Sequence, residues 1–377
     1  MIDERGTQRQ WGTARMKGSP GSIDRLENCT AQRICIIKPS AMGDVVQTLP
    51  ILPALRERFP QARICWVISR SLQSLVQGHP DLDDVILYDR RGSWRDWWTL
   101  LRRLRGERFD LVFDLQGLLR SACMSWATGA RLRIGLETAR EGSHLACHTL
   151  LPDTGRLVPA HLRYWRVAEA LGLGHLERKT DVVIQRADLV RANEWLSVVR
   201  GARLAVQPGA RWQTKQWPVE RFAAVAAKAY RQFGFSSIVV GGPEDRALGT
   251  EFEMQLKRFV PAARVLNLVG QTSLTELAAV LLSSDAMLSN DSGPMHLAAA
   301  LQLPVVGVFT CTDPVRSGPP PGLHELVSAP VSCAGSYKKK CPHRGCRQLE
   351  CFTALEVERV WQAFQQMVRR SLPSRVA

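Results

Sequence analysis

The sequence has no apolar run long enough to span a bilayer, which excludes a membrane-spanning helix. Its first 32 residues lack the apolar centre of a secretory signal peptide, so residues 1–32 are expected to form a disordered leader. Acidic side chains are also in short supply, because 35 Asp and Glu stand against 50 Lys and Arg, a net charge of +15. This surplus indicates an anionic partner: nucleic acid, a phosphorylated substrate or an acidic membrane surface.

The cysteines lack the pattern of a disulfide scaffold or of a standard zinc finger. Ten cysteines are scattered over 377 residues, and none form a C-x-x-C pair. Without a secretion signal, this distribution indicates a reduced, cytoplasmic protein. Four thiols near the C-terminus, together with His343, offer a tetrahedral zinc set in principle. Because their spacing is irregular, we expect no resident metal or other cofactor and interpret these residues as unpaired or redox-sensitive thiols: Cys333, Cys341, Cys346 and Cys351.

Short apolar strands alternate with helical segments along most of the chain, a pattern typical of βαβ units and parallel sheets. We predict two doubly wound α/β domains with a cleft between them, an N-terminal one over residues 33–185 and a C-terminal one over residues 200–350. A helix over residues 353–371 is expected to pack back on the N-terminal domain. The predicted strands are 33–38, 63–68, 84–88 and 110–114 in the first domain, and 203–207, 237–241, 265–269, 285–289 and 304–309 in the second.

The loop after the first strand, Lys38-Pro-Ser-Ala-Met-Gly-Asp44, is a candidate site. In open parallel sheets, ligands bind outside the carboxyl ends of the strands, where this loop lies. Gly43 would let the backbone approach a ligand. Asp44, at the start of a helix, is either a general base or an ordinary N-cap. The loop does not contain G-x-G-x-x-G, so the dinucleotide fingerprint is absent here.

A second loop, residues 207–218, follows the first strand of the second domain. Arg211 and Lys215 precede a helix that begins near Pro218, and Gly209 leaves backbone amides accessible. This combination suits a diphosphate held by amides, a helix N-terminus and cations. The alternative is a surface loop with solvated basic residues.

A third motif spans residues 289–301 and also joins a strand to a helix. Ser292 and Gly293 leave amides free to meet a phosphate at the helix start. Asp291 and His296 are polar groups in an otherwise apolar segment. His296 is either part of a ligand site or a hydrogen-bonded structural residue.

In order along the chain, the motifs K-P-S-A-M-G-D, P-G-A-R-W-x-x-K-x-W-P, G-G-P-E-D and N-D-S-G-P-M-H-L-A-A-A-L resemble glycosyltransferase family 9, the lipopolysaccharide heptosyltransferases. The resemblance extends over residues 33–364. D-L-Q-G-L-L-R-S at 114–121 and E-T-A-R-E-G at 137–142 are most similar to heptosyltransferase I. Ala210 and Arg211 depart from the threonines found there in some heptosyltransferase I enzymes.

The resemblance implies a GT-B fold and inverting, metal-independent transfer of L-glycero-D-manno-heptose from ADP-heptose. The implied acceptor is a Kdo residue on lipid A, met at the cytoplasmic face of the inner membrane. A heptosyltransferase II-like enzyme, another family 9 transferase, and a non-catalytic sugar-nucleotide-binding protein are the alternatives.

The resemblance also assigns roles to individual residues. Asp44 matches the catalytic base, and Lys215 matches the lysine that contacts the donor phosphates. From its charge, we expect Arg211 to help stabilise the leaving diphosphate. In the third motif Asp291 contacts the heptose, Ser292 and Gly293 supply amides, and His296 belongs to the same site. Glu244 or Asp245 holds the donor ribose. We expect Arg120 and Arg140 to bind the acceptor's carboxylates or phosphates.

The segment from Arg90 to Arg108 is rich in arginine and tryptophan. It is typical of an interfacial helix that contacts an anionic membrane surface. The alternative is an amphipathic helix with its tryptophans docked on the sheet. Because the basic residues are spread over both domains and no nucleic-acid-binding module is present, we expect no nucleic-acid partner.

Overall fold

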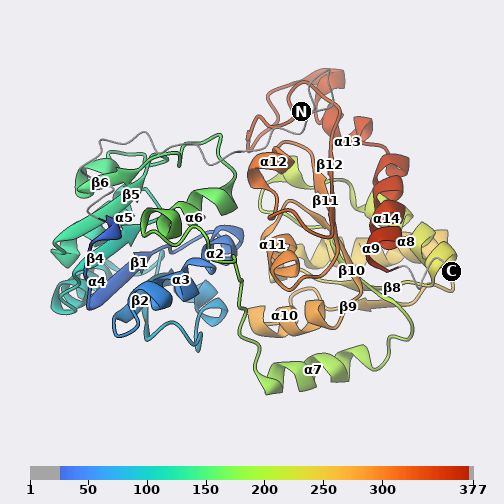
Figure 1. The fold of residues 1–377 in the computed structure, drawn as a ribbon. Coiled ribbons are helices and arrows are strands. Elements are labelled where there is room, and N and C mark those ends of the chain that lie inside the picture. The colour runs from blue at the N-terminus through green and yellow to red at the C-terminus, as the bar shows by residue number, and fades with distance from the viewer. Residues whose placement is uncertain (1–25, 373–377) are drawn as a thin grey trace.

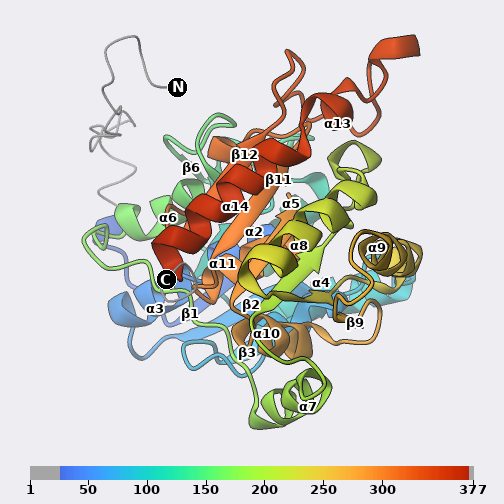
Figure 2. The ribbon, with the colours of Figure 1, turned by 90° about the vertical axis from the view of Figure 1, so that its right-hand side faces the viewer.

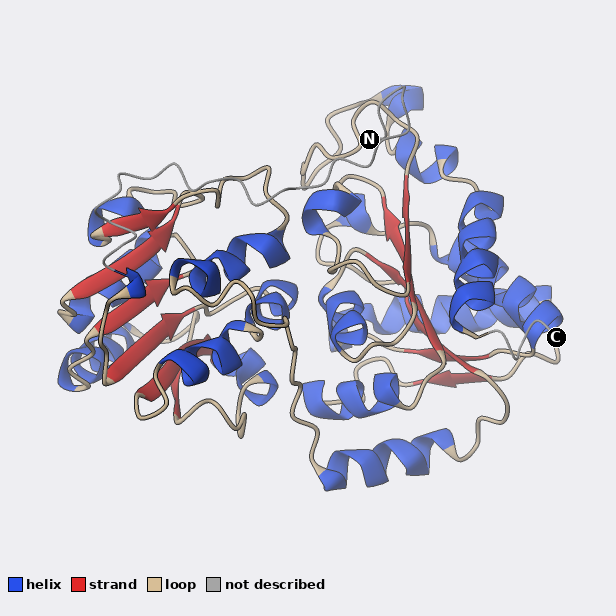
Figure 3. Cartoon of the chain, viewed as in Figure 1, coloured by secondary structure: helices blue, strands red, loops and turns tan. Residues whose placement is uncertain are grey.

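The computed structural model describes residues 26–372, which form two lobes side by side (Figure 1). Each lobe is built on a six-stranded sheet whose strands are all parallel, with helices on both faces (Figure 3). The predicted pair of doubly wound α/β domains is therefore confirmed.

The first sheet has the order β3-β2-β1-β4-β5-β6 and the second β12-β11-β10-β7-β8-β9. Every strand predicted from the sequence is present, within a few residues of its expected ends, whereas β5, β6 and β12 were not predicted. The strands are β1 (Arg33–Ile37), β2 (Arg63–Ser69), β3 (Asp84–Tyr88), β4 (Leu111–Asp114), β5 (Leu132–Leu136), β6 (Thr149–Leu151), β7 (Arg203–Gln207), β8 (Ser236–Val239), β9 (Val265–Asn267), β10 (Ala286–Asn290), β11 (Val305–Phe309) and β12 (His324–Ser328).

The α-helices and one 3-10 helix connect these strands and cover both faces of the sheets. The first lobe carries α2 (Met42–Thr48), α3 (Ile51–Arg58), the short 3-10 helix η1 (Arg70–Leu75), α4 (Trp94–Gly106), α5 (Leu119–Thr128) and α6 (Ala160–Ala170). The second carries α7 (Arg186–Leu196), α8 (Val219–Phe233), α9 (Arg246–Phe259), α10 (Leu274–Leu282), α11 (Gly293–Ala300), α12 (Pro314–Ser317), α13 (Glu350–Ala354) and α14 (Val357–Ser371).

The alternation of side chains along β1 divides the first core into two halves. Ile34 and Ile36 pack with α2, α3 and α6 on one face of the sheet. Cys35 and Ile37 pack with α4 and α5 on the other. Since both faces are covered, the strand is a continuous apolar run, as expected for a parallel sheet. Its carboxyl end leads through residues 38–41 into α2, the helix that carries Asp44.

Pro50 interrupts the helical segment after β1 because it has no N–H group to donate, whereas Pro53 is tolerated in the first turn of α3. The first helix, α2, ends at Thr48, and Pro50 stands at the N-cap of α3. The helix α2 begins at Met42. Asp44 is therefore the third residue of the helix, and Ala41 is its N-cap.

The C-terminal helix α14 packs on the second lobe, and the expectation that it returns to the N-terminal domain is wrong. Its buried residues Val360, Phe364 and Val368 belong to the same apolar cluster as residues of α8 and β11. Figure 2 shows α14 lying along α8. Ion pairs from Lys228 to Glu358 and from Arg370 to Glu325 border this contact. The amphipathic pattern predicts a buried face but does not specify which surface will cover it.

The expected leader is only partly within the described residues. Residues 1–25 lie outside them. For residues 26–32 the expectation of disorder is wrong, because Leu26 is buried in the first core and Arg58 donates to the carbonyls of Glu27 and Cys29. Between residues 26 and 372, no helix combines the length and apolarity needed to cross a membrane.

Candidate active site

The N-terminal ends of α2 and α11 meet where the two lobes touch. A Cβ on Gly43 would lie 2.5 Å from Cδ2 of His296, and a Cβ on Gly293 would lie 2.6 Å from Sδ of Met42. Each helix thus presents a glycine to a side chain of the other. Gly43 was predicted to admit a ligand; in this structure it admits the imidazole of His296. The first and third sequence motifs, 250 residues apart, are thereby brought into contact.

Asp44 is held by groups from three segments of the first lobe. Its Oδ1 accepts a hydrogen bond of 2.8 Å from the Tyr164 hydroxyl, on α6. Its Oδ2 accepts from the Ala41 amide at 3.4 Å and lies 3.9 Å from Nζ of Lys38. The side chain is still 38% exposed. Asp44 therefore serves as a helix-capping acceptor and also presents a carboxylate to its surroundings.

The charge state of Asp44 follows from these contacts. Desolvation raises the pKa of this carboxyl, whereas Lys38, the Tyr164 hydroxyl, the Ala41 amide and His296 lower it, and the net shift is downward. Asp44 is consequently ionised at neutral pH and able to accept a proton.

Sequence reasoning assigned no role to Lys38, although it opens the first motif. The side chain is buried, with Nζ donating to the Leu115 carbonyl at 3.1 Å and lying 4.8 Å from the centre of the Tyr164 ring. Burial lowers the pKa of Lys38, and Asp44 opposes that shift. A lysine at the end of an otherwise apolar, buried strand is the signal that could have identified it, because buried lysines require partners.

Lys215 and Asp291, predicted to contact different parts of the donor, form an ion pair. Nζ of Lys215 lies 2.7 Å from Oδ2 of Asp291, which also accepts a hydrogen bond of 2.6 Å from Thr312. Asp291 is buried. The pair fixes the ammonium group beside the N-terminal end of α11, where Ser292 is the N-cap and Gly293 the first helical residue.

Asn290 holds the second loop in place over this helix. Its side chain is fully buried, with Oδ1 accepting from the Trp217 amide at 3.1 Å and Nδ2 donating to the Pro208 carbonyl at 2.6 Å. Arg211, in the same loop, is exposed. Asn290 was not singled out from the sequence, because its role depends on a loop more than 70 residues away.

The structure distinguishes Glu244 from Asp245, the two candidates for the ribose-binding acid. Asp245 is buried and accepts a hydrogen bond from Gln207 at 3.2 Å. A Cβ on Gly209 would lie 2.3 Å from Cγ of Asp245, so this carboxyl packs directly against the backbone of the second loop. Glu244 is exposed. Of the two carboxylates, Glu244 is the accessible one.

Arg120 and Arg140 lie at the same sheet edge as Asp44. Arg120 lies in the first turn of α5, after β4, the neighbour of β1, and Arg140 lies in the loop after β5, one strand further from β1. The Arg140 amide donates to the Gly117 carbonyl at 2.9 Å. Gly117 has φ +66°, and a Cβ there would lie 3.1 Å from Cα of Ala139, so glycine permits the close approach of the loops. Both arginines are exposed, and Arg120 donates to the Tyr88 hydroxyl.

The cysteine cluster does not form a metal centre. Within the part of the chain that the structure describes, no group of three or more His, Cys, Asp or Glu side chains could hold a metal ion. All ten cysteines are free thiols; Cys346 is exposed, whereas burial raises the pKa of Cys351 to about 12. Cys35 and Cys65 are buried in the core, whereas Cys123 is exposed.

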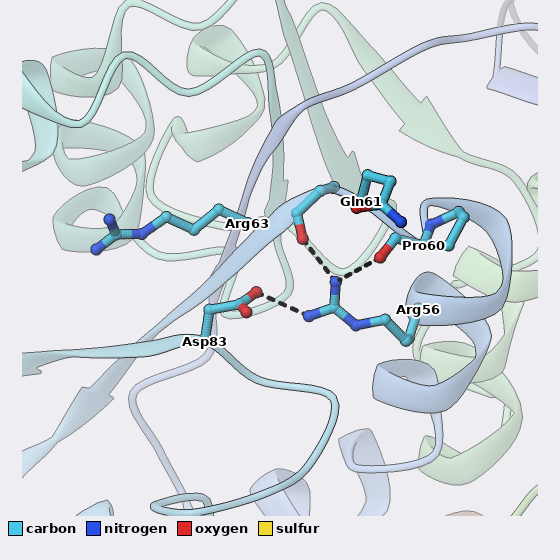
Figure 4. Close-up of a pocket in the computed structure, with 6 residues that line it drawn as sticks. Arg56, Pro60, Gln61, Arg63 and Asp83 are labelled. Atoms are coloured by element: carbon cyan, nitrogen blue, oxygen red, sulfur yellow. Dashed lines mark hydrogen bonds and ion pairs between the residues drawn. The ribbon is translucent and has the colours of Figure 1, made fainter.

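Figure 4 shows a pocket at the amino ends of strands β2 and β3 of the first sheet, opposite the end where Asp44 lies. It is lined by Arg56, Pro60, Gln61, Ala62, Arg63 and Asp83. Arg56 pairs with Asp83 at 2.7 Å and donates to the backbone carbonyls of Pro60, Ala62 and Asp81, so both terminal nitrogens of its guanidinium have partners. Asp83 belongs to the triplet Asp81-Leu82-Asp83, which has the D-x-D form. Because it lies at the amino ends of β2 and β3, this triplet is not part of the candidate site.

A family model described as glycosyltransferase family 9 (heptosyltransferase) matches residues 97–347. The chain belongs to this family. Relatives of the family 9 chain include a lipopolysaccharide core heptosyltransferase, OpsX, of Haemophilus influenzae, 28% identical over 78% of this chain and 84% of the relative. Lipopolysaccharide heptosyltransferase 1 of Pseudomonas aeruginosa is 27% identical over 89% and 98%. Lipopolysaccharide heptosyltransferase 3 of Escherichia coli is 24% identical over 88% and 97%.

Solved structures of the family share the fold of both lobes. A glycosyltransferase family 9 protein from Veillonella parvula superposes with a TM-score of 0.74 at 24% identity, over 90% of this chain and 98% of that one. The Escherichia coli heptosyltransferase WaaC with ADP superposes with a TM-score of 0.65 at 23% identity, over 91% and 99%. The predicted GT-B fold is thus confirmed for this family 9 glycosyltransferase.

Tyr164→Phe is expected to destabilise the enzyme by about 1.5 kcal/mol at pH 7, the lower end for a hydrogen bond to a charged group, since Asp44 is partly exposed. The folded-state pKa of Asp44 is lowered, so this contribution is present at neutral pH and is lost as the pH falls through that pKa. Urea unfolding at pH 7 and at pH 3.5 measures the difference. Tyr230→Phe, which removes a hydrogen bond to the Ala262 carbonyl, is the control. A destabilisation by Tyr164→Phe that does not shrink in acid would contradict the ionic character of the contact.

Proposed function

We propose that this family 9 enzyme is an inverting, metal-independent transferase that moves L-glycero-D-manno-heptose from ADP-heptose to a Kdo residue of the lipopolysaccharide inner core. The observation that carries the proposal is the contact of α2 with α11. It sets an ionised carboxylate, Asp44, against the segment that holds Lys215 and Asp291. The motifs shared with heptosyltransferase I and the ADP in the WaaC structure support the choice of donor.

The chemistry divides between the lobes. Asp44 takes the proton of an acceptor hydroxyl as that oxygen attacks the anomeric carbon from the face opposite ADP. The new glycosidic C–O bond forms, the bond to the diphosphate breaks, and the electron pair leaves with ADP. Lys215, Arg211 and the amides of Ser292 and Gly293 stabilise the charge that develops on the diphosphate. Glu244 binds the ribose, and Asp291 and His296 face the heptose.

The test is turnover of a panel of ADP-sugars and other nucleotide-sugars with Kdo-lipid A, in the presence of EDTA. Transfer of heptose to Kdo is the expected result. Transfer only to an acceptor that already carries heptose would indicate a heptosyltransferase II-like enzyme, and transfer only to another glycan would indicate a different member of the family. Donor binding without any turnover would indicate a sugar-nucleotide-binding protein, and strict dependence on added magnesium would contradict the metal-independent scheme.

Arg140→Ala is expected to raise the KM for the acceptor and to leave the affinity for ADP unchanged. Arg140 is exposed at the sheet edge beside Asp44 and lies close enough to Lys38 to lower the pKa of that lysine. A guanidinium there suits the carboxylates and phosphates of the lipid acceptor. Initial rates at varied acceptor give the KM, and calorimetry gives the ADP affinity. Arg186→Ala, at the start of α7 on the second lobe, is the control. Loss of ADP affinity with normal acceptor dependence would reverse the proposed division between lobes.

We also infer that the enzyme is cytoplasmic and makes peripheral contact with the inner membrane through α4. Trp97 packs edge-on against Tyr88, and Leu100 and Leu104 are buried, so one face of α4 docks on the sheet as the alternative prediction has it. Trp94 and Trp98, however, are 69% and 52% exposed, and the helix carries several exposed arginines. Indole rings and cations together suit the headgroup region of an anionic membrane.

Replacing both Trp94 and Trp98 by alanine is therefore expected to weaken sedimentation with vesicles that contain anionic phospholipid. Met254→Ala is a control, because Met254 is also exposed but lies on α9 of the second lobe. Equal sedimentation of the double variant and the control would contradict the membrane role of α4.

A further inference from the structure

Gln47 connects the helix of the candidate base to the second lobe. It lies three residues after Asp44 on α2, and its side chain is buried. Its Nε2 lies 2.7 Å from Nδ1 of His296 and 3.4 Å from the carbonyl oxygen of Gly318, both in the second lobe. Gln47 lies just outside the first motif. Among the described residues, its side chain makes no hydrogen bond to Asp44 or Lys215.

His296 continues this connection toward the donor motif. Burial lowers the pKa of His296, while Asp291 and Asp44 oppose that shift and Lys215 adds to it. The ring is therefore neutral at pH 7 and carries one N–H. With Nδ1 accepting from the Gln47 amide, the proton lies on Nε2, which is 3.9 Å from Oδ1 of Asp291. The other carboxylate oxygen of Asp291 binds Lys215. A continuous series of polar contacts thus runs from Lys215 to the helix that carries Asp44.

Close steric contacts between α2 and α11 accompany this series of polar contacts. Gly43 lies directly against the His296 ring and Gly293 against Met42, and any added Cβ would come within 2.6 Å of its neighbour. The relative placement of α2 and α11 therefore depends on the His296–Gln47 contact and on these two glycines. A shift of His296 within the donor motif is transmitted directly to α2, because close-packed groups cannot absorb it.

We propose that Gln47 is a positioning residue for heptosyl transfer, which acts through His296 to set Asp44 relative to the donor held by Lys215 and Asp291. The proposal rests on the proposed function. It predicts that replacing Gln47 lowers the rate of transfer and leaves the affinity for ADP unchanged. The reason is that the hydrogen bonds of the Gln47 side chain go to His296 and Gly318, and not to Lys215, Arg211 or Glu244.

The first variant is Gln47→Met, which keeps the length of the side chain and removes the hydrogen bond. The expected result is a fall in kcat of about tenfold, the equivalent of one lost hydrogen bond, with the ADP affinity from calorimetry within about twofold of wild type. Gln73→Met is the matched control. Gln73 lies on η1, which packs on α10 at the same junction of lobes, and its side-chain amide donates to Gln77 on its own lobe. Thermal unfolding shows whether each variant is folded.

The second variant, Gln47→Glu, gives a readout that a purely structural role would not move. A carboxylate beside Nδ1 favours the imidazolium, so the pKa of His296 is expected to rise. The protonated Nδ1 of His296 then donates to the introduced carboxylate. The ratio of the activity of Gln47→Glu to that of Gln47→Met should therefore increase as the pH falls from 8 to 6. The groups that face His296 and share in this titration are Asp44, Asp291, Lys215, His161 and His324. Titration of the histidine ring by NMR measures the shift directly.

Gly43→Ala tests the steric part of the proposal independently. Its Cβ would collide with the His296 ring, so transfer should be lost while ADP binding is kept. Gly106→Ala is the control, since a Cβ there meets nothing within 4 Å.

Two results for Gln47→Met would overturn the role of Gln47. One is a normal kcat. The other is a parallel loss of ADP affinity, which would place Gln47 in donor binding. An inactive wild-type enzyme overturns the proposed function instead, and the positioning role with it.

Discussion

Asp44→Asn is expected to fold and to bind ADP but to lose transfer by about 10²–10⁴-fold, the usual contribution of a general base. Asparagine keeps an oxygen that can accept from Tyr164, so the local structure should persist. It has no basic oxygen to take the proton from the acceptor hydroxyl. Single-turnover rates at saturating donor and acceptor, with calorimetry for ADP, separate the chemical step from binding.

The matched control for this variant is Asp96→Asn on α4. Asp96 is also the third residue of its helix, and its carboxylate accepts from the N-cap amide of Ser93 at 2.7 Å. It thus shares the capping role of Asp44 and lies away from α11. If Asp44→Asn retained near-normal turnover, Asp44 would be reduced to the same capping function as Asp96.

Lys215→Ala is expected to weaken donor binding and to slow transfer by about 10²-fold, as when one fixed donor to a developing anion is removed. The ammonium is already fixed by Asp291, so little reorganisation accompanies the departure of the diphosphate. The substitution also leaves the buried Asp291 without its cation, which should lower the thermal stability of the variant. Donor titration followed by kcat measurement at saturating donor distinguishes the two effects on activity.

Two further variants bound the interpretation of this result. Lys215→Arg keeps the charge and should recover part of the donor affinity. Lys228→Ala breaks the exposed ion pair with Glu358, far from α11, and should change neither binding nor rate. A Lys215→Ala enzyme with normal donor affinity and normal kcat would show that the diphosphate is held by other groups.

The sheets were largely predictable from the sequence because both faces of their central strands are buried. Continuous apolar runs such as residues 34–37 and 305–309 have few other structural interpretations. β5 and β12 were missed because they contain Arg133 and the pair His324–Glu325, and β6 because it has only three residues. These strands lie toward the sheet edges, where polar residues are tolerated, so their pattern resembles that of loops.

The candidate site was predictable only where its residues belong to a local motif. Asp44, Lys215 and Asp291 all lie in segments that connect a strand to the next helix, or in the first turn of that helix, and the topology places such segments at the carboxyl ends of the strands. Tyr164 lies in the middle of α6, in no motif, and reaches Asp44 from 120 residues away. The pairing of Lys215 with Asp291 and of Gln47 with His296 depends on how the loops and lobes pack, which no spacing within the sequence expresses.

The docking of α14 on the second lobe has a consequence for how the two halves of the enzyme can be recombined. Within the described chain, the backbone passes between the lobes once, along residues 171–185 (Figure 1), because α7 already packs on α10. Neither sheet borrows a strand from the other half. A chimera joined within this segment would therefore exchange the entire first lobe between relatives while both sheets stay whole. The surfaces where α2 meets α11 and η1 meets α10 would need to be matched, so the first lobe can be exchanged without rebuilding the second.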